Sequence, residues 1–178
     1  MKRRFGYVSN SSSSSFVVVP DSVVEEFNSD YERHLMESYE RLRTTMEFSH
    51  VEKGWCGLFA DAQTTFSWEQ VLYHGLKDKW NWLVLQAYYW GGNVYRQRLD
   101  SFVESLQLGL KIDWRKIERR VQDDFTAYID HQSIDPVDTF NEVDKVGIDE
   151  FLTNPKCHIH NSNDNVDEEE EGDFEERW

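Results

Sequence analysis

The chain has 178 residues, about the size of one domain, and carries a formal net charge of −15. Aromatic residues make up 15% of it, which is enough to build an apolar core, so we expect a folded protein and not a disordered one. No apolar run approaches the ~18 residues that a membrane span needs. Because phosphate contacts need Lys and Arg, a charge this negative also disfavours direct binding to nucleic acid.

The start of the chain predicts a protein that is not exported. Three of the first four residues after Met1 are basic, but the apolar stretch of a signal peptide does not follow them. Cys56 and Cys157 lie far apart in the sequence, and in an intracellular protein we expect both to be free thiols.

The first half of the chain predicts two short strands, a helix and a third strand. A strand at residues 5–8 leads into a serine-rich segment, and the β-branched run at 16–19 predicts a buried strand. Residues 21–47 have the spacing of an exposed helix, and residues 66–73 alternate aromatic and polar side chains as a strand does.

The second half predicts an αα-hairpin followed by shorter elements. In residues 77–90, a core-facing helix stripe is formed by Trp80, Leu83, Val84, Ala87 and Tyr88. Gly91 and Gly92 end this helix, and a second apolar stripe over 93–110 predicts its antiparallel partner. Short helices are expected at 114–121 and 143–152, and strands at 125–129 and 156–160.

These elements predict an α+β fold, in which a small mixed or antiparallel sheet packs against the αα-hairpin and further helices. We expect one domain over residues 1–160 and an acidic C-terminal tail over 161–178. The tail holds nine acidic residues and one Arg, a net charge of −8, which leaves −7 for the rest of the chain.

The opening segment resembles an N-terminal motif of uncharacterised proteins from tailed bacteriophages and some bacteria. The matching residues are Gly6, Tyr7, Val8, Ser9, Asn10, Ser11, Ser12, Ser13, Ser14, Ser15 and Phe16. Residues 66–69, 128–133, 151–152 and 163–165 resemble later parts of the same proteins in the same order. The resemblance implies a phage-encoded protein that works in the host cytoplasm, and it implies no particular activity or cofactor.

The serine tract permits three interpretations. It could be a polar turn or linker, a segment recognised or covalently modified at serine, or a loop that cradles an anion such as phosphate. The residues concerned are Ser9, Asn10, Ser11, Ser12, Ser13, Ser14 and Ser15. The acid-rich turn at Asn163, Asp164 and Asn165 could bind a cation or a ligand, or be an Asx turn.

Two further groups are candidates for chemistry. Asp130, His131 and Ser133 bring an acid, a base and a hydroxyl into four residues. Neighbours in a strand point to opposite faces, so Asp130 cannot easily orient His131. A catalytic set of His131 and Ser133 would therefore need a third group from another segment. The weak candidates for metal ligands are His131, Cys157, His158 and His160, whose spacing matches no known zinc motif. The phage proteins that the chain resembles lack the last two histidines, which disfavours a metal site there.

The acidic tail is the main candidate for contact with a partner protein. Its residues that would dock into a basic, apolar groove are Glu168, Glu169, Glu170, Glu171, Phe174 and Trp178. We therefore expect a phage accessory protein, not an enzyme, that binds a host or phage protein with a basic surface and so contributes to host takeover. The alternatives are a nucleotide- or phosphate-binding enzyme with the serine tract in its pocket, and a minor structural protein of the virion.

Overall fold

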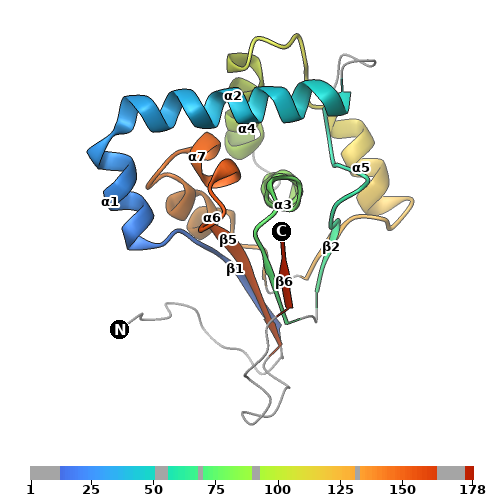
Figure 1. Ribbon diagram of the computed structural model, residues 1–178. Helices are drawn as coiled ribbons and strands as arrows, with labels where there is room; N and C mark the ends of the chain where they lie inside the picture. Colours follow the sequence, from blue (N-terminus) through green and yellow to red (C-terminus); the bar gives the residue numbers. More distant parts are fainter. Residues whose placement is uncertain (1–12, 51–55, 68–69, 90–92, 131–132, 164–174) are drawn as a thin grey trace.

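The computed structural model describes residues 13–50, 56–67, 70–89, 93–130, 133–163 and 175–178. These residues form seven α-helices, a four-stranded mixed sheet and a two-stranded parallel sheet (Figure 1). The predicted α+β class is therefore confirmed. In the described part of the chain, no helix is long and apolar enough to cross a membrane.

The larger sheet joins the two ends of the described chain. Its strands are β1 (Ser13–Val18), β5 (His158–Asn163), β3 (Val71–Tyr73) and β6 (Glu175–Arg177), in that spatial order. Strand β5 is antiparallel to both β1 and β3, whereas β6 is parallel to β3. The smaller sheet pairs β2 (Thr65–Phe66) with β4 (Tyr128–Ile129).

Helix α3 (Leu76–Tyr89) lies at the centre of the molecule and is the main element of the core (Figure 1). It is surrounded by α4 (Asn93–Ser105), α5 (Trp114–Gln122), α6 (Pro136–Val143) and α7 (Ile148–Thr153). The helix was expected to bury one face, but every residue from Lys79 to Tyr88 is buried. A helix enclosed on all sides must satisfy its polar side chains internally. Asn81, for example, donates to the carbonyls of Phe59 and Gln63.

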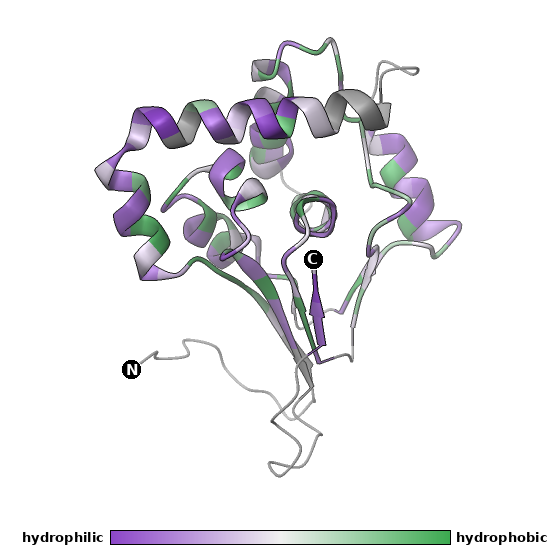
Figure 2. Ribbon diagram, in the orientation of Figure 1, coloured by the Kyte–Doolittle hydropathy of each residue, from purple (hydrophilic) through white to green (hydrophobic). Residues whose placement is uncertain are grey.

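Helices α1 (Asp21–Ser29) and α2 (Tyr31–His50) cover one side of this arrangement. Helix α2 crosses the molecule far from the larger sheet and packs mainly on α7 (Figure 1). Its outward face is largely hydrophilic, while Ser38 and Leu42 are buried beneath it (Figure 2).

The predicted elements differ from the structure in several places. The helix expected over 143–152 is wrong, because Val143 ends α6 and Gly147, with φ of 87°, separates it from α7. The strand expected over 66–73 is divided between β2 and β3. The boundary expected at residue 160 lies inside β5, and residues 175–177 add an edge strand to the same sheet.

Candidate functional site

Two of the predicted segments, the serine tract and residues 130–133, meet strand β5 at one buried polar cluster. The backbone N–H of Ser15 donates to the Ser133 hydroxyl oxygen at 3.0 Å, and the Ser15 hydroxyl donates to Oδ1 of Asn161. Asn161 also donates through Nδ2 to the Ser67 carbonyl at 2.6 Å. Strand pairing sets Ser13 opposite Asn163, so the described end of the serine tract and the last residue of β5 are neighbours along their backbones.

Ser15 and Asn161 bond groups within the protein through their side chains, whereas Oε1 of the adjoining Gln86 is buried without a partner. Ser15, Ser133 and Asn161 are all buried, and Gln86 donates to the Ser133 carbonyl at 2.6 Å. Asp130 is buried beside them, where its backbone N–H and carbonyl bond Phe66 and Ser133. A phosphate cradle needs donors that point at the ligand. The described donors of Ser15 point at Ser133 and Asn161 instead, so this end of the tract ties β1 to the core.

The described candidates for metal ligands lie in β5 and directly before it. Cys157 is fully buried, and burial raises the pKa of its thiol to about 12. The His160 ring stacks on Phe16 at 4.8 Å between centroids, whereas the His158 ring lies 5.0 Å from that of His74. Within the described residues, no group of three His, Cys, Asp or Glu side chains is placed to hold a metal ion.

Several predicted site residues lie outside the described residues. They are Ser9, Asn10, Ser11, Ser12, His131, Asp164, Asn165, Glu168, Glu169, Glu170, Glu171 and Phe174. Trp178 is described: its side chain is 72% exposed, yet its ring stacks on His74 at 4.2 Å. That histidine donates through Nδ1 to the Pro155 carbonyl at 2.8 Å.

A second acidic region, which the sequence analysis missed, lies on α1 and α2. Residues 21–40 hold seven acidic residues and one Arg, a net charge of −6, and all seven acids are exposed. They are Asp21, Glu25, Glu26, Asp30, Glu32, Glu37 and Glu40. Salt bridges among the described residues engage two of them, as Asp30 pairs with Arg33 and Glu26 with Lys156. The number of acids in residues 21–40 could have indicated this region from the sequence alone. The prediction fell on the tail instead, because its net charge is larger.

Large apolar side chains are exposed within the same acidic region. Tyr31 is 52% exposed and Met36 is 64% exposed. We refer to the seven acids with these two side chains as the acidic α1–α2 surface. Aromatic residues and Met are the side chains that protein interfaces favour, and acids around them select for a basic partner.

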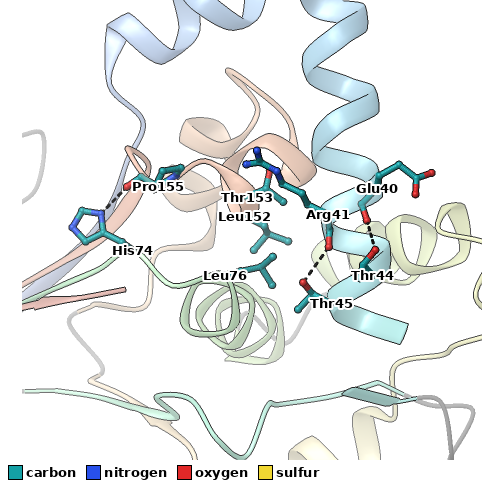
Figure 3. A pocket seen from close by; sticks show the side chains of 9 residues that line it. All are labelled: Glu40, Arg41, Thr44, Thr45, His74, Leu76, Leu152, Thr153 and Pro155. Atoms are coloured by element: carbon teal, nitrogen blue, oxygen red, sulfur yellow. Dashed lines mark hydrogen bonds between the residues drawn. The ribbon is translucent and has the colours of Figure 1, made fainter. Parts of the chain in front are cut away.

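A cavity of about 540 Å³ opens between α2, α7 and the start of α3. Leu76 and Leu152 lie at its centre (Figure 3). Helix α2 contributes two charged and two hydroxyl side chains, and the remaining lining comes from the β3–α3 connection and the end of α7. The complete lining is Glu40, Arg41, Thr44, Thr45, His74, Leu76, Leu152, Thr153 and Pro155.

Lys79 is the most unusual buried group near this cavity. Its Nζ donates to the carbonyls of Asn154 and Cys157 at 2.9 and 3.2 Å and lies 5.4 Å from the centre of the Phe151 ring. Burial lowers the pKa of Lys79 to about 8. These contacts join α3 to the carbonyl end of α7, where a positive charge is favourable, so the group has a structural role.

Comparison with protein-family models, with curated proteins and with solved structures finds no match to this chain.

Proposed function

We propose that this chain is a phage-encoded binding protein that docks through its acidic α1–α2 surface onto a basic surface of a host or phage protein. The observation that supports the proposal is the gathering of seven exposed acids and two exposed large apolar side chains on two consecutive helices. The acidic tail adds charge of the same sign and would strengthen the same attraction.

The arrangement on α2 favours binding over a purely solubilising role. A solvated helix face needs only polar side chains, whereas Tyr31 and Met36 expose large apolar side chains among the acids. In a complex they can serve as apolar anchors within a charged rim, which is the usual anatomy of a protein interface. Acids around such anchors speed the encounter with a basic partner and disfavour acidic ones.

The two alternatives have less support from the described residues. For a phosphate-binding enzyme, the described donors of Ser15 would have to leave Ser133 and Asn161 before they could meet a ligand. For a minor virion protein, no feature of the described residues favours assembly over the binding of a separate partner.

Site-specific photo-crosslinking in infected cells tests the proposal. A photoreactive amino acid at Met36 should give a discrete adduct with a second protein. The same group at Val94, which is also exposed but lies on α4, should not. Equal adduct patterns from both positions would contradict the proposal.

Charge variants then test whether the acids cause the binding. Changing Glu25, Glu32, Glu37 and Glu40 to Gln removes four negative charges from the acidic α1–α2 surface. The matched control removes the same charge from exposed positions elsewhere, at Glu104, Glu118, Asp123 and Asp124. With the crosslinked partner purified, the first variant should bind at least about tenfold more weakly and lose most of its salt dependence. A similar loss in both variants would mean that net charge alone drives binding.

A further inference from the structure

The cavity between α2 and α7 adjoins the acidic α1–α2 surface, and one residue belongs to both. Glu40 is one of the seven exposed acids and also lines the cavity. Met36, Glu40 and Thr44 follow at i, i+4 and i+8, so their side chains are neighbours along one stripe of α2. This stripe leads from an exposed apolar side chain, past an acid, into the cavity.

The surface of the cavity is more apolar than the three threonines in its lining would indicate. The hydroxyls of Thr44, Thr45 and Thr153 donate to the carbonyls of Glu40, Arg41 and Asp149, each four residues earlier in its own helix. With these donors engaged, the threonines offer mainly methyl groups to an occupant. Leu76 offers partly exposed apolar surface to the cavity, while Leu152, which is fully buried, forms part of the wall beneath (Figure 3).

We infer that this cavity receives an apolar side chain from a basic segment of the partner protein, with the segment running along the Met36–Glu40–Thr44 stripe. The inference rests on the proposed function and names the partner's chemistry: Lys or Arg residues facing Glu37 and Glu40, and one large apolar residue over Leu76 and Leu152. Charge complementarity selects this occupant, since a basic segment meets the acids of α2 on the way to the cavity.

The volume of about 540 Å³ lies within the ~300–1,000 Å³ typical of ligand pockets, so it accommodates an aromatic or long aliphatic side chain. The Arg41 guanidinium, which also lines the cavity, would donate hydrogen bonds to a carbonyl or carboxylate of the same segment. The pattern sought in a partner is therefore a cationic segment with a single large apolar residue among its contact residues.

Two synthetic helical peptides provide a direct test. They have equal length and equal numbers of Lys, but one has Leu and the other Ala on the contact face. Titration calorimetry at low salt should show that the intact protein binds the Leu peptide about tenfold more tightly, because one apolar side chain becomes buried. Thr45→Trp fills the cavity and should abolish this preference. Ser101→Trp, an exposed position on α4, should retain it.

The outcomes separate this inference from the proposed function. If the four-Gln variant of α1 and α2 weakens both peptides while the intact protein does not prefer Leu, the cavity inference is overturned and the acidic surface still stands. A Leu preference that persists in Thr45→Trp, and in Thr44→Trp as a second cavity-filling variant, also overturns it. Sedimentation must show a monomer, because a dimer broken by Thr45→Trp would assign the cavity to a second copy and overturn the inference.

Discussion

The backbone N–H of Ser15 donates a hydrogen bond to the side chain of Ser133, a residue 118 positions later in the chain. Both residues are buried, so the bond is shielded from water and joins the edge strand β1 to the segment before α6. In the sequence, Ser15 cannot be told apart from the other serines of the tract. In the fold, its backbone N–H has a specific partner.

Removing that partner should destabilise the fold. In Ser133→Ala the Ser15 N–H is left buried without an acceptor, which costs about 1–3 kcal/mol. Urea unfolding should show a lower midpoint with an unchanged slope. Ser101→Ala, at an exposed site on α4, should leave the midpoint unchanged. If both variants unfold alike, the hydrogen bond to Ser133 contributes no measurable stability.

The sequence was most informative where the pattern is local. The spacing of Trp80, Leu83 and Val84 predicts α3 because it repeats with the helical period. It could not show that Trp82 and Leu85 on the opposite side are buried as well, because that depends on segments distant in the sequence that pack around the helix.

Long-range contacts account for what the sequence could not predict. Strand β6 has three charged residues and no intrinsic strand preference, and its pairing with β3 crosses about a hundred residues of chain. The acidic tail was the expected partner site, yet most of its residues lie outside the described part. The acids of residues 21–40 were visible in the sequence, but that all seven of them are exposed required the fold.

The buried Lys79 should give the protein a distinctive pH dependence. Its pKa is lowered to about 8 from an ordinary value of 10.5, so the unfolded chain binds this proton more tightly. The penalty of a buried charge is full below pH 8 and is relieved as pH rises towards 10.5. Over that window the stability of the wild-type protein should rise relative to Lys79→Met, by at most about 1.4 kcal/mol per pH unit.

The change of stability with pH tests this prediction better than the difference in stability between the wild-type protein and Lys79→Met at a single pH. Lys79→Met also removes the hydrogen bonds to the carbonyls of Asn154 and Cys157, which lowers stability at every pH. Lys111→Met, at an exposed position, serves as the control and should show no such slope. Parallel curves for wild type and Lys79→Met would mean that Lys79 titrates normally in the folded protein.

Both cysteines should be protected from thiol reagents. Cys56 and Cys157 are fully buried, and burial raises the pKa of each thiol to about 12, so neither forms a reactive thiolate near neutral pH. Reaction with a chromogenic disulfide reagent should be at least about a hundredfold slower in the folded protein than in concentrated urea, since it must await opening of the fold. Rapid labelling of both thiols in the folded protein would contradict this burial.

The turn before α7 should tolerate no side chain at Gly147. Its φ of 87° and ψ of 162° lie in a region that is essentially restricted to glycine, and a Cβ there would meet Oδ1 of Asp149 at 2.9 Å.

Gly109 is a matched control, because its φ of 67° is also positive but a Cβ there meets nothing within 4 Å. Gly109→Ala should therefore cost about 1–2 kcal/mol from backbone strain alone. Gly147→Ala adds the cost of a φ and ψ that only glycine adopts readily, and should lose more stability in the same urea titration. Since α7 carries Leu152 and Thr153 into the cavity, it should also weaken the preference for a Leu-bearing peptide, which Gly109→Ala should leave intact. Equal losses of stability in the two variants would mean that the turn adjusts to the new side chain.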